Sequence, residues 1–233
     1  MSTPPATPST NVHRGDKDFF ADIARRLYSA VLSDVLDELG FTHQAMKARI
    51  RPLDEDLVLV GIARTGQFRE VDRAVPGENP YELEIRLVDD LKPGEVVVFA
   101  CDGSDRIAPW GELLTTAALA RGAVGAVTDG FVRDVRSIRG LKFPVFHGGI
   151  APLDSKGRGK VVEIDVPIEC AGVRVESGDL IFGDVDGLIV VPRKVEDEAL
   201  ARALAKVSSE NITRDELRRG AKLKEVFDRY GVL

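Results

Sequence analysis

The chain has 233 residues, of which 44% are hydrophobic, so it is long enough to bury one large core. Acidic residues outnumber basic ones by 38 to 32, and this net charge of −6 argues against a general nucleic-acid binder, which needs a basic surface to displace counterions. No apolar run reaches the length of a membrane span and no signal peptide is visible at the start, so we expect a soluble, cytoplasmic protein without a membrane partner.

The first forty residues predict a flexible start followed by helix. Residues 1–15 are rich in Pro, Ser and Thr and predict a disordered leader. Apolar residues then recur every four positions over 18–39, which is the helical period. Ser29 or Ser33 is a possible cap or break in this helical stretch, and Gly40 is a plausible stop.

The middle of the chain predicts a parallel sheet. The branched apolar run at 57–63 favours a buried strand, and PGEN at 76–79 favours a turn before the next helix. Residues 95–146 then alternate between strand-like and helix-like segments. Such alternation is typical of parallel strands joined by right-handed crossovers.

The last third predicts a change of architecture. Short β segments after Gly157 indicate mainly antiparallel or mixed sheet, with GDVDG at 183–187 as a hairpin turn rather than a cofactor-binding loop. A charged helical tail follows at 196–233, with a predicted interruption at 211–213. We therefore expect one α/β domain over 16–195, flanked by N-terminal and C-terminal helices.

Two loops are expected to carry the chemistry, because ligands of open α/β sheets bind beyond the carboxyl ends of parallel strands. The loop after the strand at 95–100 leads into a helix that starts with Gly111, Glu112, Leu113 and Leu114. The loop after the strand at 123–128 carries Arg133 and Asp134. Both loops should leave neighbouring strands at the same end and meet at one crevice.

The residue types in this crevice predict a metal-assisted anion site. Carboxylates of Glu112 and Asp134, without a histidine or cysteine cluster, favour Mg²⁺ or Mn²⁺ over Zn²⁺. The free N–H groups of Leu113 and Leu114 at a helix start suit a substrate carboxylate, and Arg133 offers a planar donor for a carboxylate or an oxyanion. A solvated helix start and a surface Arg-Asp pair would look the same, so the pattern by itself leaves both interpretations open.

The segment GELLTTAALARGAVGAVTDGFVRDV resembles the central motif of the 4-hydroxy-4-methyl-2-oxoglutarate and 4-carboxy-4-hydroxy-2-oxoadipate aldolases and of the RraA-like proteins. In those aldolases an acidic residue is followed by twenty residues and then Arg-Asp, and Glu112 and Arg133 stand at this separation. SAVLSDVLDELG, KPGEVVVF and VPIECAGVRVESGDLIFGDVDGLIVVP extend the resemblance over nearly the whole chain from about Leu27.

The resemblance implies a fold and an assembly. The family fold is a swivelling β/β/α domain related to phosphohistidine domains, and its members are usually homotrimers or homohexamers built as dimers of trimers. Sites of the family lie between subunits. Asp34, on the first helical stretch, is therefore either a substrate-binding residue of a neighbouring subunit's site or a residue of a solvated helix face.

The resemblance also implies an activity: a divalent-metal-dependent lyase that cleaves a 4-hydroxy-2-oxo acid to pyruvate, with oxaloacetate decarboxylase activity. It implies Asp134 as a direct metal ligand and Glu112 as a ligand through water. Arg133 and Glu112 are the implied catalytic residues, and the expected substrate contacts come from Gly111, Leu113, Leu114, Arg133 and Asp34.

Three further points bear on this interpretation. The alternative function is that of an RraA-type regulator, which binds and inhibits a ribonuclease without catalysis. The aldolases carry Asp where this chain has Glu112, so pocket size and substrate preference are expected to differ. Cys101 and Cys170 are expected to be buried reduced thiols, and His147 is expected to have a structural or specificity role.

Overall fold

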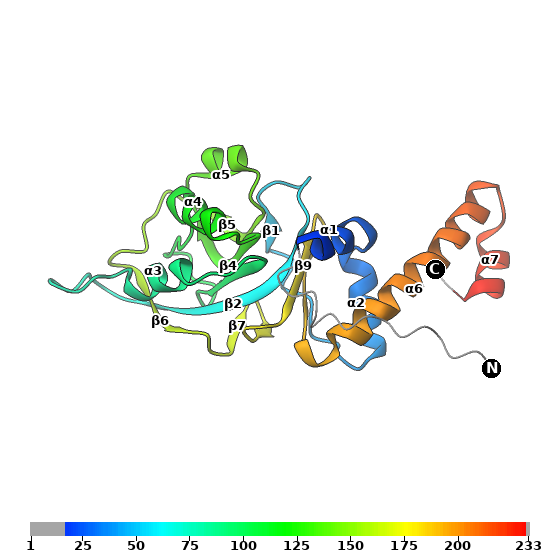
Figure 1. Ribbon diagram of the computed structural model, residues 1–233, viewed down its shortest axis with the longest axis horizontal. Helices are drawn as coiled ribbons and strands as arrows, with labels where there is room; N and C mark the ends of the chain where they lie inside the picture. Colours follow the sequence, from blue (N-terminus) through cyan, green and yellow to red (C-terminus); the bar gives the residue numbers. More distant parts are fainter. Residues whose placement is uncertain (1–16, 232–233) are drawn as a thin grey trace.

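Strand β2 (Leu59–Glu70) is the longest strand of the sheet and connects its two halves. The computed structural model describes residues 17–231. The start of β2 pairs antiparallel with β9 (Leu180–Asp184), its middle parallel with β3 (Glu95–Ala100), and its end antiparallel with β6 (Gly159–Ile164). Figure 1 shows β2 as a long curved strand that runs through the body of the molecule.

The predicted parallel unit is confirmed. β2, β3, β4 and β5 lie side by side and parallel, and the helices α3, α4 and α5 connect them. The order across the sheet is β1-β5-β4-β3-β2-β9-β10. The bounds of the elements not yet given are β1 (Arg51–Pro52), α3 (Glu82–Asp89), α4 (Glu112–Arg121), β4 (Gly125–Val132), α5 (Val135–Leu141), β5 (Val145–Ile150) and β10 (Gly187–Val191).

Both faces of the parallel strands are covered, which explains their continuous apolar sequences. Along β3, Val97 and Phe99 pack into the core beneath α3, α4 and α5, whereas Val96 and Val98 pack on the opposite side. The opposite side is covered by a two-stranded hairpin, β7 (Ile168–Cys170) and β8 (Val173–Val175). Cys101 and Cys170 are buried and free, as expected, and burial raises the pKa of both thiols.

The N-terminal helical stretch is divided at Ser29, one of the two expected break positions. α1 (Lys17–Arg26) and α2 (Ser29–Glu38) are separate helices. The backbone N–H of Ser29 donates to Asp184 at 2.8 Å, and its hydroxyl donates to the same carboxylate at 2.7 Å. A residue of β9 therefore fixes where the second helix begins. The expected stop at Gly40 is confirmed by its left-handed φ of 84°.

The predicted interruption of the tail at 211–213 is wrong. α6 (Glu196–Arg218) runs through these residues without a break, and the chain turns only at Gly220, with φ 92°, before α7 (Leu223–Tyr230). The polar side chains are accommodated within the helix, since Asn211 accepts a hydrogen bond from Arg214 one turn later and Thr213 is buried. Tertiary and local contacts override the weak helix propensity of these residues.

The expected fold class is confirmed as a mixed α/β domain with N-terminal and C-terminal helices, and the hairpin at 183–187 is confirmed by the β9–β10 pairing. The leader predicted for residues 1–15 lies outside the described residues. Within residues 17–231, no helix combines the length and the apolar character needed to cross a lipid bilayer.

Close packing between β4 and β2 gives a first prediction. A Cβ atom on Gly125 would clash with the Leu59 side chain and lie 2.9 Å from the Pro144 carbonyl oxygen. We expect Gly125→Ala to lower the free energy of unfolding by about 1–3 kcal/mol, because this core has no room for a methyl group. Urea unfolding measures the change. Gly140→Ala is the control, since nothing lies within 4 Å of that position and α5 gains a better helix former.

Candidate active site

A cavity of about 260 Å³ lies where the loops after all four parallel strands meet. Its volume suits a small metabolite rather than a large cofactor. Such a position beyond the carboxyl ends of the strands is the expected ligand site of an α/β sheet. The cavity is lined by Tyr81, Glu84, Ile85, Ala108, Pro109, Trp110, Gly111, Leu113, Leu114, Arg133, Asp134, Asp154 and Ser155.

The loop after β3 reaches this cavity because it runs beside the end of β4. The Phe131 amide donates to the Ile107 carbonyl at 2.9 Å, and the Arg133 amide donates to the Trp110 carbonyl at 3.0 Å. Trp110 and Val132 form a parallel β-bridge between these two bonds. The pairing places the start of α4 directly against the Arg-Asp pair.

The predicted approach of the two loops is observed at Asp134. The Glu112 backbone N–H donates to Asp134 Oδ2 at 3.2 Å. Gly111 makes the approach possible, since a Cβ atom there would lie only 2.7 Å from the same oxygen. Asp134 itself has a left-handed φ of 59°, a conformation that Asp tolerates better than most residues. The Glu112 carboxylate accepts a hydrogen bond from Thr116 Oγ1 at 2.7 Å, one turn further along α4, and does not line the cavity.

These residues are better suited to bind a hard cation weakly, together with water and substrate, than to enclose a cation with protein ligands alone. Within residues 17–231, no cluster of three or more His, Cys, Asp or Glu side chains is arranged to hold a metal. Asp134 is exposed at the cavity edge, whereas Glu112 reaches this corner through its backbone N–H, and its side chain does not line the cavity. Mg²⁺ is commonly bound by one or two carboxylates together with water and substrate oxygens, and Asp134 offers one such carboxylate.

Arg133 is held between acidic groups on both sides. Its Nε lies 3.8 Å from Asp134 Oδ2, and its Nη1 lies 3.7 Å from Asp154 Oδ1. Nη1 also donates to the Leu153 carbonyl at 3.4 Å. The guanidinium group is therefore fixed in the cavity wall, where it can donate to a bound anion.

The start of α4 supplies further donors. Leu113 and Leu114 lie in the first turn of the helix, where backbone N–H groups have no intrahelical acceptor. The Leu114 side chain packs against the core, whereas the Leu113 side chain is 79% exposed. Their amides and the helix dipole favour an anion at this end of the cavity.

Three residues of the cavity wall, Tyr81, Glu84 and Asp154, were missed in the sequence. The Tyr81 hydroxyl donates to both oxygens of Asp154, at 3.0 and 2.9 Å. Burial and this bond raise the pKa of Tyr81 to about 12. Burial acts to raise the pKa of Asp154, but hydrogen bonds from Tyr81 and from backbone amides outweigh it, so that pKa lies below its ordinary value. Asp154 is thus ionised at neutral pH.

Glu84 behaves in the opposite way. It is only 5% exposed, and burial together with the nearby Asp154 charge raises its pKa to about 8, against the opposing effect of Arg133. The signal for Glu84 was present in the sequence, because it occupies the buried face of α3 with Leu87 and Val88 at helical spacing. An acid on an apolar stripe is a candidate functional residue.

Two expected site residues lie elsewhere. Asp34, on α2, accepts a hydrogen bond from Lys206 of α6 at 2.9 Å and does not line this cavity in its own chain. His147, on β5, is buried outside the cavity, and burial, with the nearby Arg139 charge, lowers its pKa. The structural or specificity role expected for His147 stays a prediction.

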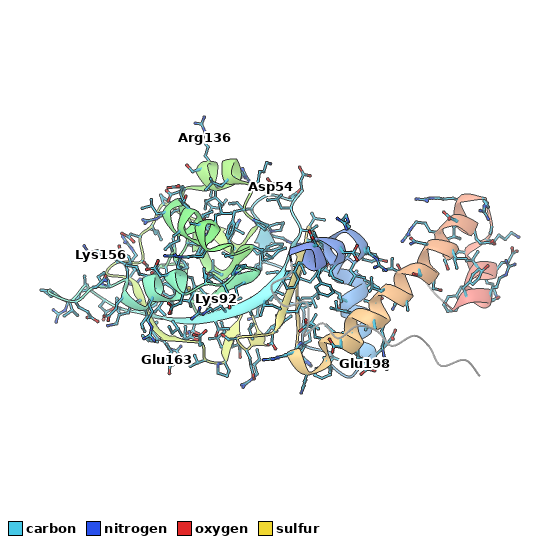
Figure 2. All side chains as sticks on the ribbon, viewed as in Figure 1. Asp54, Lys92, Arg136, Lys156, Glu163 and Glu198 are labelled. Atoms are coloured by element: carbon cyan, nitrogen blue, oxygen red, sulfur yellow. The ribbon has the colours of Figure 1, made fainter. Side chains whose placement is uncertain are left out.

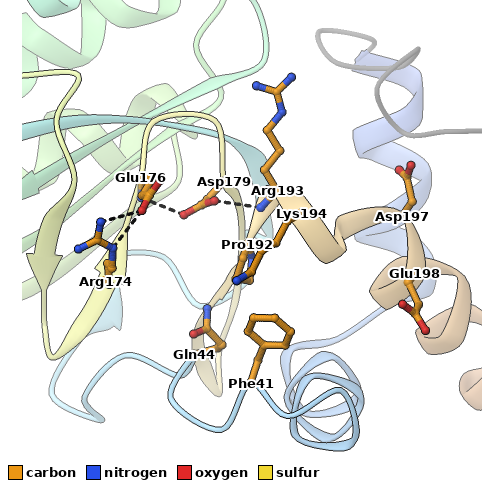
Figure 3. Close-up of a pocket in the computed structure, with 10 residues that line it drawn as sticks. All are labelled: Phe41, Gln44, Arg174, Glu176, Asp179, Pro192, Arg193, Lys194, Asp197 and Glu198. Atoms are coloured by element: carbon orange, nitrogen blue, oxygen red, sulfur yellow. Dashed lines mark hydrogen bonds and ion pairs between the residues drawn. The ribbon is translucent and has the colours of Figure 1, made fainter.

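A larger groove of about 910 Å³ lies between the β-hairpin side of the body and the start of α6 (Figure 3). Several of its polar groups are already hydrogen-bonded within the protein. Arg174 bonds Glu176, and Asp179 accepts from the backbone amides of Glu176 and Arg193. The groove lies away from the carboxyl ends of the parallel strands, so we place the chemistry in the smaller cavity.

Fold and site together define an α/β protein with a small, partly polar cavity beyond the carboxyl ends of its parallel strands. The model of the family RraA-like (Aldolase/RraA) matches residues 29–190, and the chain belongs to this family. It is 36% identical over 182 residues to a Halalkalibacterium halodurans protein provisionally named 4-hydroxy-4-methyl-2-oxoglutarate aldolase, covering 78% of this chain and 80% of that protein.

Two further relatives show the range of the family. A Thermus thermophilus protein named 4-hydroxy-4-methyl-2-oxoglutarate aldolase is 32% identical over 107 residues, which is 46% of this chain and 65% of that protein. The crystal structure of Streptomyces coelicolor RraAS2, described as an unusual member of the RNase ES inhibitor RraA protein family, superposes with a TM-score of 0.75 at 28% identity. That match covers 86% of this chain and 98% of RraAS2.

The raised pKa of Glu84 predicts a pH-dependent stability. Its proton is bound more tightly in the folded state, with a pKa of about 8 against an ordinary 4.5. The resulting stabilisation is fully present below about pH 4.5 and is lost as the pH rises through about 8. Over this pH range we expect the free energy of unfolding of the wild type to fall by on the order of a few kcal/mol relative to that of Glu84→Gln. Denaturant unfolding at a series of pH values measures the difference, and parallel curves for the two proteins would contradict it.

Proposed function

We propose that the protein is a divalent-metal-dependent lyase that releases pyruvate from a 4-hydroxy-2-oxo acid. The observation that carries the proposal is the convergence of Arg133, Asp134 and the start of α4 on one small cavity. An arginine, a carboxylate and free backbone amides suit a substrate that carries a carboxylate next to a keto group. The names of the aldolase relatives support the same reaction class.

In this proposal the two ends of the cavity have separate tasks. The amides of Leu113 and Leu114 bind the substrate carboxylate, with Gly111 leaving room beside them. Asp134 would hold Mg²⁺ or Mn²⁺, and Glu112 would assist through water. The cation supplies Lewis-acid stabilisation of negative charge on the keto oxygen. Arg133 donates to the same oxygen, and its fixed position means that little reorganisation is needed during the reaction.

The carbon–carbon bond then breaks between carbon 3 and carbon 4 of the substrate. A water molecule near Glu112 takes the proton of the 4-hydroxyl group, and the carbon–carbon electron pair moves into the bond between carbons 2 and 3. The product on this side is the enolate of pyruvate. Loss of carbon dioxide from oxaloacetate yields the same enolate, so the same residues account for a decarboxylase activity.

Glu112 is the position from which we expect substrate preference to differ from that of the aldolases with Asp. The extra methylene brings the carboxylate within 2.7 Å of Thr116 Oγ1 on the next turn of α4. It thereby changes the space available beside Asp134. The second product of cleavage is expected to differ accordingly in size or charge.

A regulatory function is the second candidate, because the structure of RraAS2 is described as that of a ribonuclease-inhibitor family member. Inhibition by direct contact needs a surface and makes no use of the cavity. Charged and polar groups directed into a small cavity therefore favour catalysis over regulation.

We also propose that the protein works as a homotrimer or as a dimer of trimers. α6 extends away from the body and carries α7 at its far end (Figure 1). This arm exposes Ile212, Leu223 and Phe227 by 53%, 51% and 43%. Apolar side chains on a projecting arm favour contact with another subunit, which could also bring the partner's Asp34 toward a cavity. Light scattering after gel filtration measures the mass, and a monomer at micromolar concentration contradicts the proposal.

Removing the anion-binding or metal-binding group tests the activity. We expect Arg133→Ala and Asp134→Asn each to lower the rate of pyruvate release from oxaloacetate by about 100-fold or more, since each removes charge stabilisation of the enolate. A coupled dehydrogenase assay with Mg²⁺ or Mn²⁺ measures the rate, and chelation of the metal should have the same effect on the wild type.

Arg136→Ala is the matched control, because Arg136 is an exposed arginine of α5 that points away from the body (Figure 2). It should keep wild-type activity. Undiminished turnover by a folded double variant of Arg133 and Asp134 would sink the proposal.

A further inference from the structure

Glu84 is a buried carboxyl group in the wall of the cavity, and the cycle described above gives it no task. It lines the cavity from α3 and is 5% exposed. Its Oε2 is buried and has no hydrogen-bond partner among the described residues. Leu87 and Val88 share its helix face, so an apolar residue would serve packing better than a carboxyl group does.

The groups that face Glu84 come from three segments. Asp154 follows β5, Arg133 ends β4, and Tyr81 precedes α3. Asp154 is satisfied by Tyr81 and stays charged, whereas Glu84 receives no such bond and stays protonated at neutral pH, with a pKa of about 8. Two carboxyl groups with opposite protonation in one cavity are a typical division between a charged group and an acid.

We propose that Glu84 is the catalytic acid that protonates carbon 3 of the pyruvate enolate formed in this cavity. The inference rests on the proposed function and adds the step that completes it. The position of Glu84 on α3 separates this acid from Asp134, the proposed metal ligand, which follows β4.

The step balances without any further reactant. The enolate electron pair between carbons 2 and 3 forms a new bond from carbon 3 to the proton of the Glu84 carboxyl group. The O–H bond of Glu84 breaks and leaves a carboxylate, while the carbonyl at carbon 2 re-forms. Glu84 then takes a proton from water, and nothing is oxidised or reduced.

The reverse of this step can be measured with pyruvate alone. In D₂O with Mn²⁺, the carboxylate form of Glu84 removes a methyl proton from pyruvate and returns deuterium, which proton NMR follows as loss of the methyl signal. We expect Glu84→Gln to slow this exchange by about 100-fold or more, because the amide has nearly the same shape but cannot shuttle a proton. Glu82→Gln, an exposed glutamate of the same helix, is the matched control and should exchange at the wild-type rate.

The pH dependence separates proton transfer from a structural effect. Since exchange begins from ionised Glu84, the wild-type rate should rise as the pH increases through about 8 and then level off. Residual exchange by Glu84→Gln should lack this rise. Binding of oxalate, a flat dianion like the enolate, in the presence of Mn²⁺ should be unchanged in the variant, because Arg133 and Asp134 are intact.

A measurement independent of turnover completes the test. The infrared difference spectrum between wild type and Glu84→Gln at pH 7 should contain the carbonyl band of a protonated carboxyl group. An ionised Glu84 at this pH overturns the proposal. Exchange by Glu84→Gln at the wild-type rate also overturns it. A wild type that releases pyruvate but does not exchange its methyl protons overturns it as well. Each of these two outcomes leaves the proposed function standing. A wild type that neither releases pyruvate from oxaloacetate nor exchanges its methyl protons ends both proposals together.

Discussion

The pairing of the loop after β3 with the end of β4 is the constraint on which the site depends. Two backbone hydrogen bonds and the bridge between Trp110 and Val132 hold this loop in register with the strand. Because Trp110 is buried beneath α4 and stacks on Phe143, the loop is anchored in the core as well as at the sheet edge. The start of α4 is therefore held rigidly against Arg133 and Asp134, which is the precision that a catalytic site requires.

The cavity also brings together carboxyl groups that differ in protonation state. Hydrogen bonds from Tyr81 stabilise the charge on Asp154, whereas Glu84 lies a short distance away without any such donor. Arg133 is compensated by Asp134 and Asp154, so the wall holds one cation between two anions. A neutral acid, charged side chains and the amides of a helix start therefore lie together in one small volume.

The same architecture is shared by relatives named for different functions, so the fold by itself does not decide between catalysis and regulation. The choice between catalysis and regulation depends on the side chains that the loops place at the carboxyl ends of the strands. Surface complementarity to a ribonuclease would depend on the outer faces of the molecule, while the groups at issue here point into a cavity. The proposed function therefore depends on the residues that line this cavity.

Local sequence determined most of the elements of this protein. Turn residues and apolar periodicity predicted the strand at 95–100, the parallel unit and the hairpin at 183–187, because these signals act between residues close in the chain. The error at 211–213 arose from the same local rules, which cannot register the burial of Thr213.

The motif around Glu112, Arg133 and Asp134 also pointed to the strand ends at which the cavity lies. Only the tertiary structure added Tyr81, Glu84 and Asp154 to the site. These residues meet through strand order and loop packing, and the burial that sets their protonation is created by segments remote in sequence.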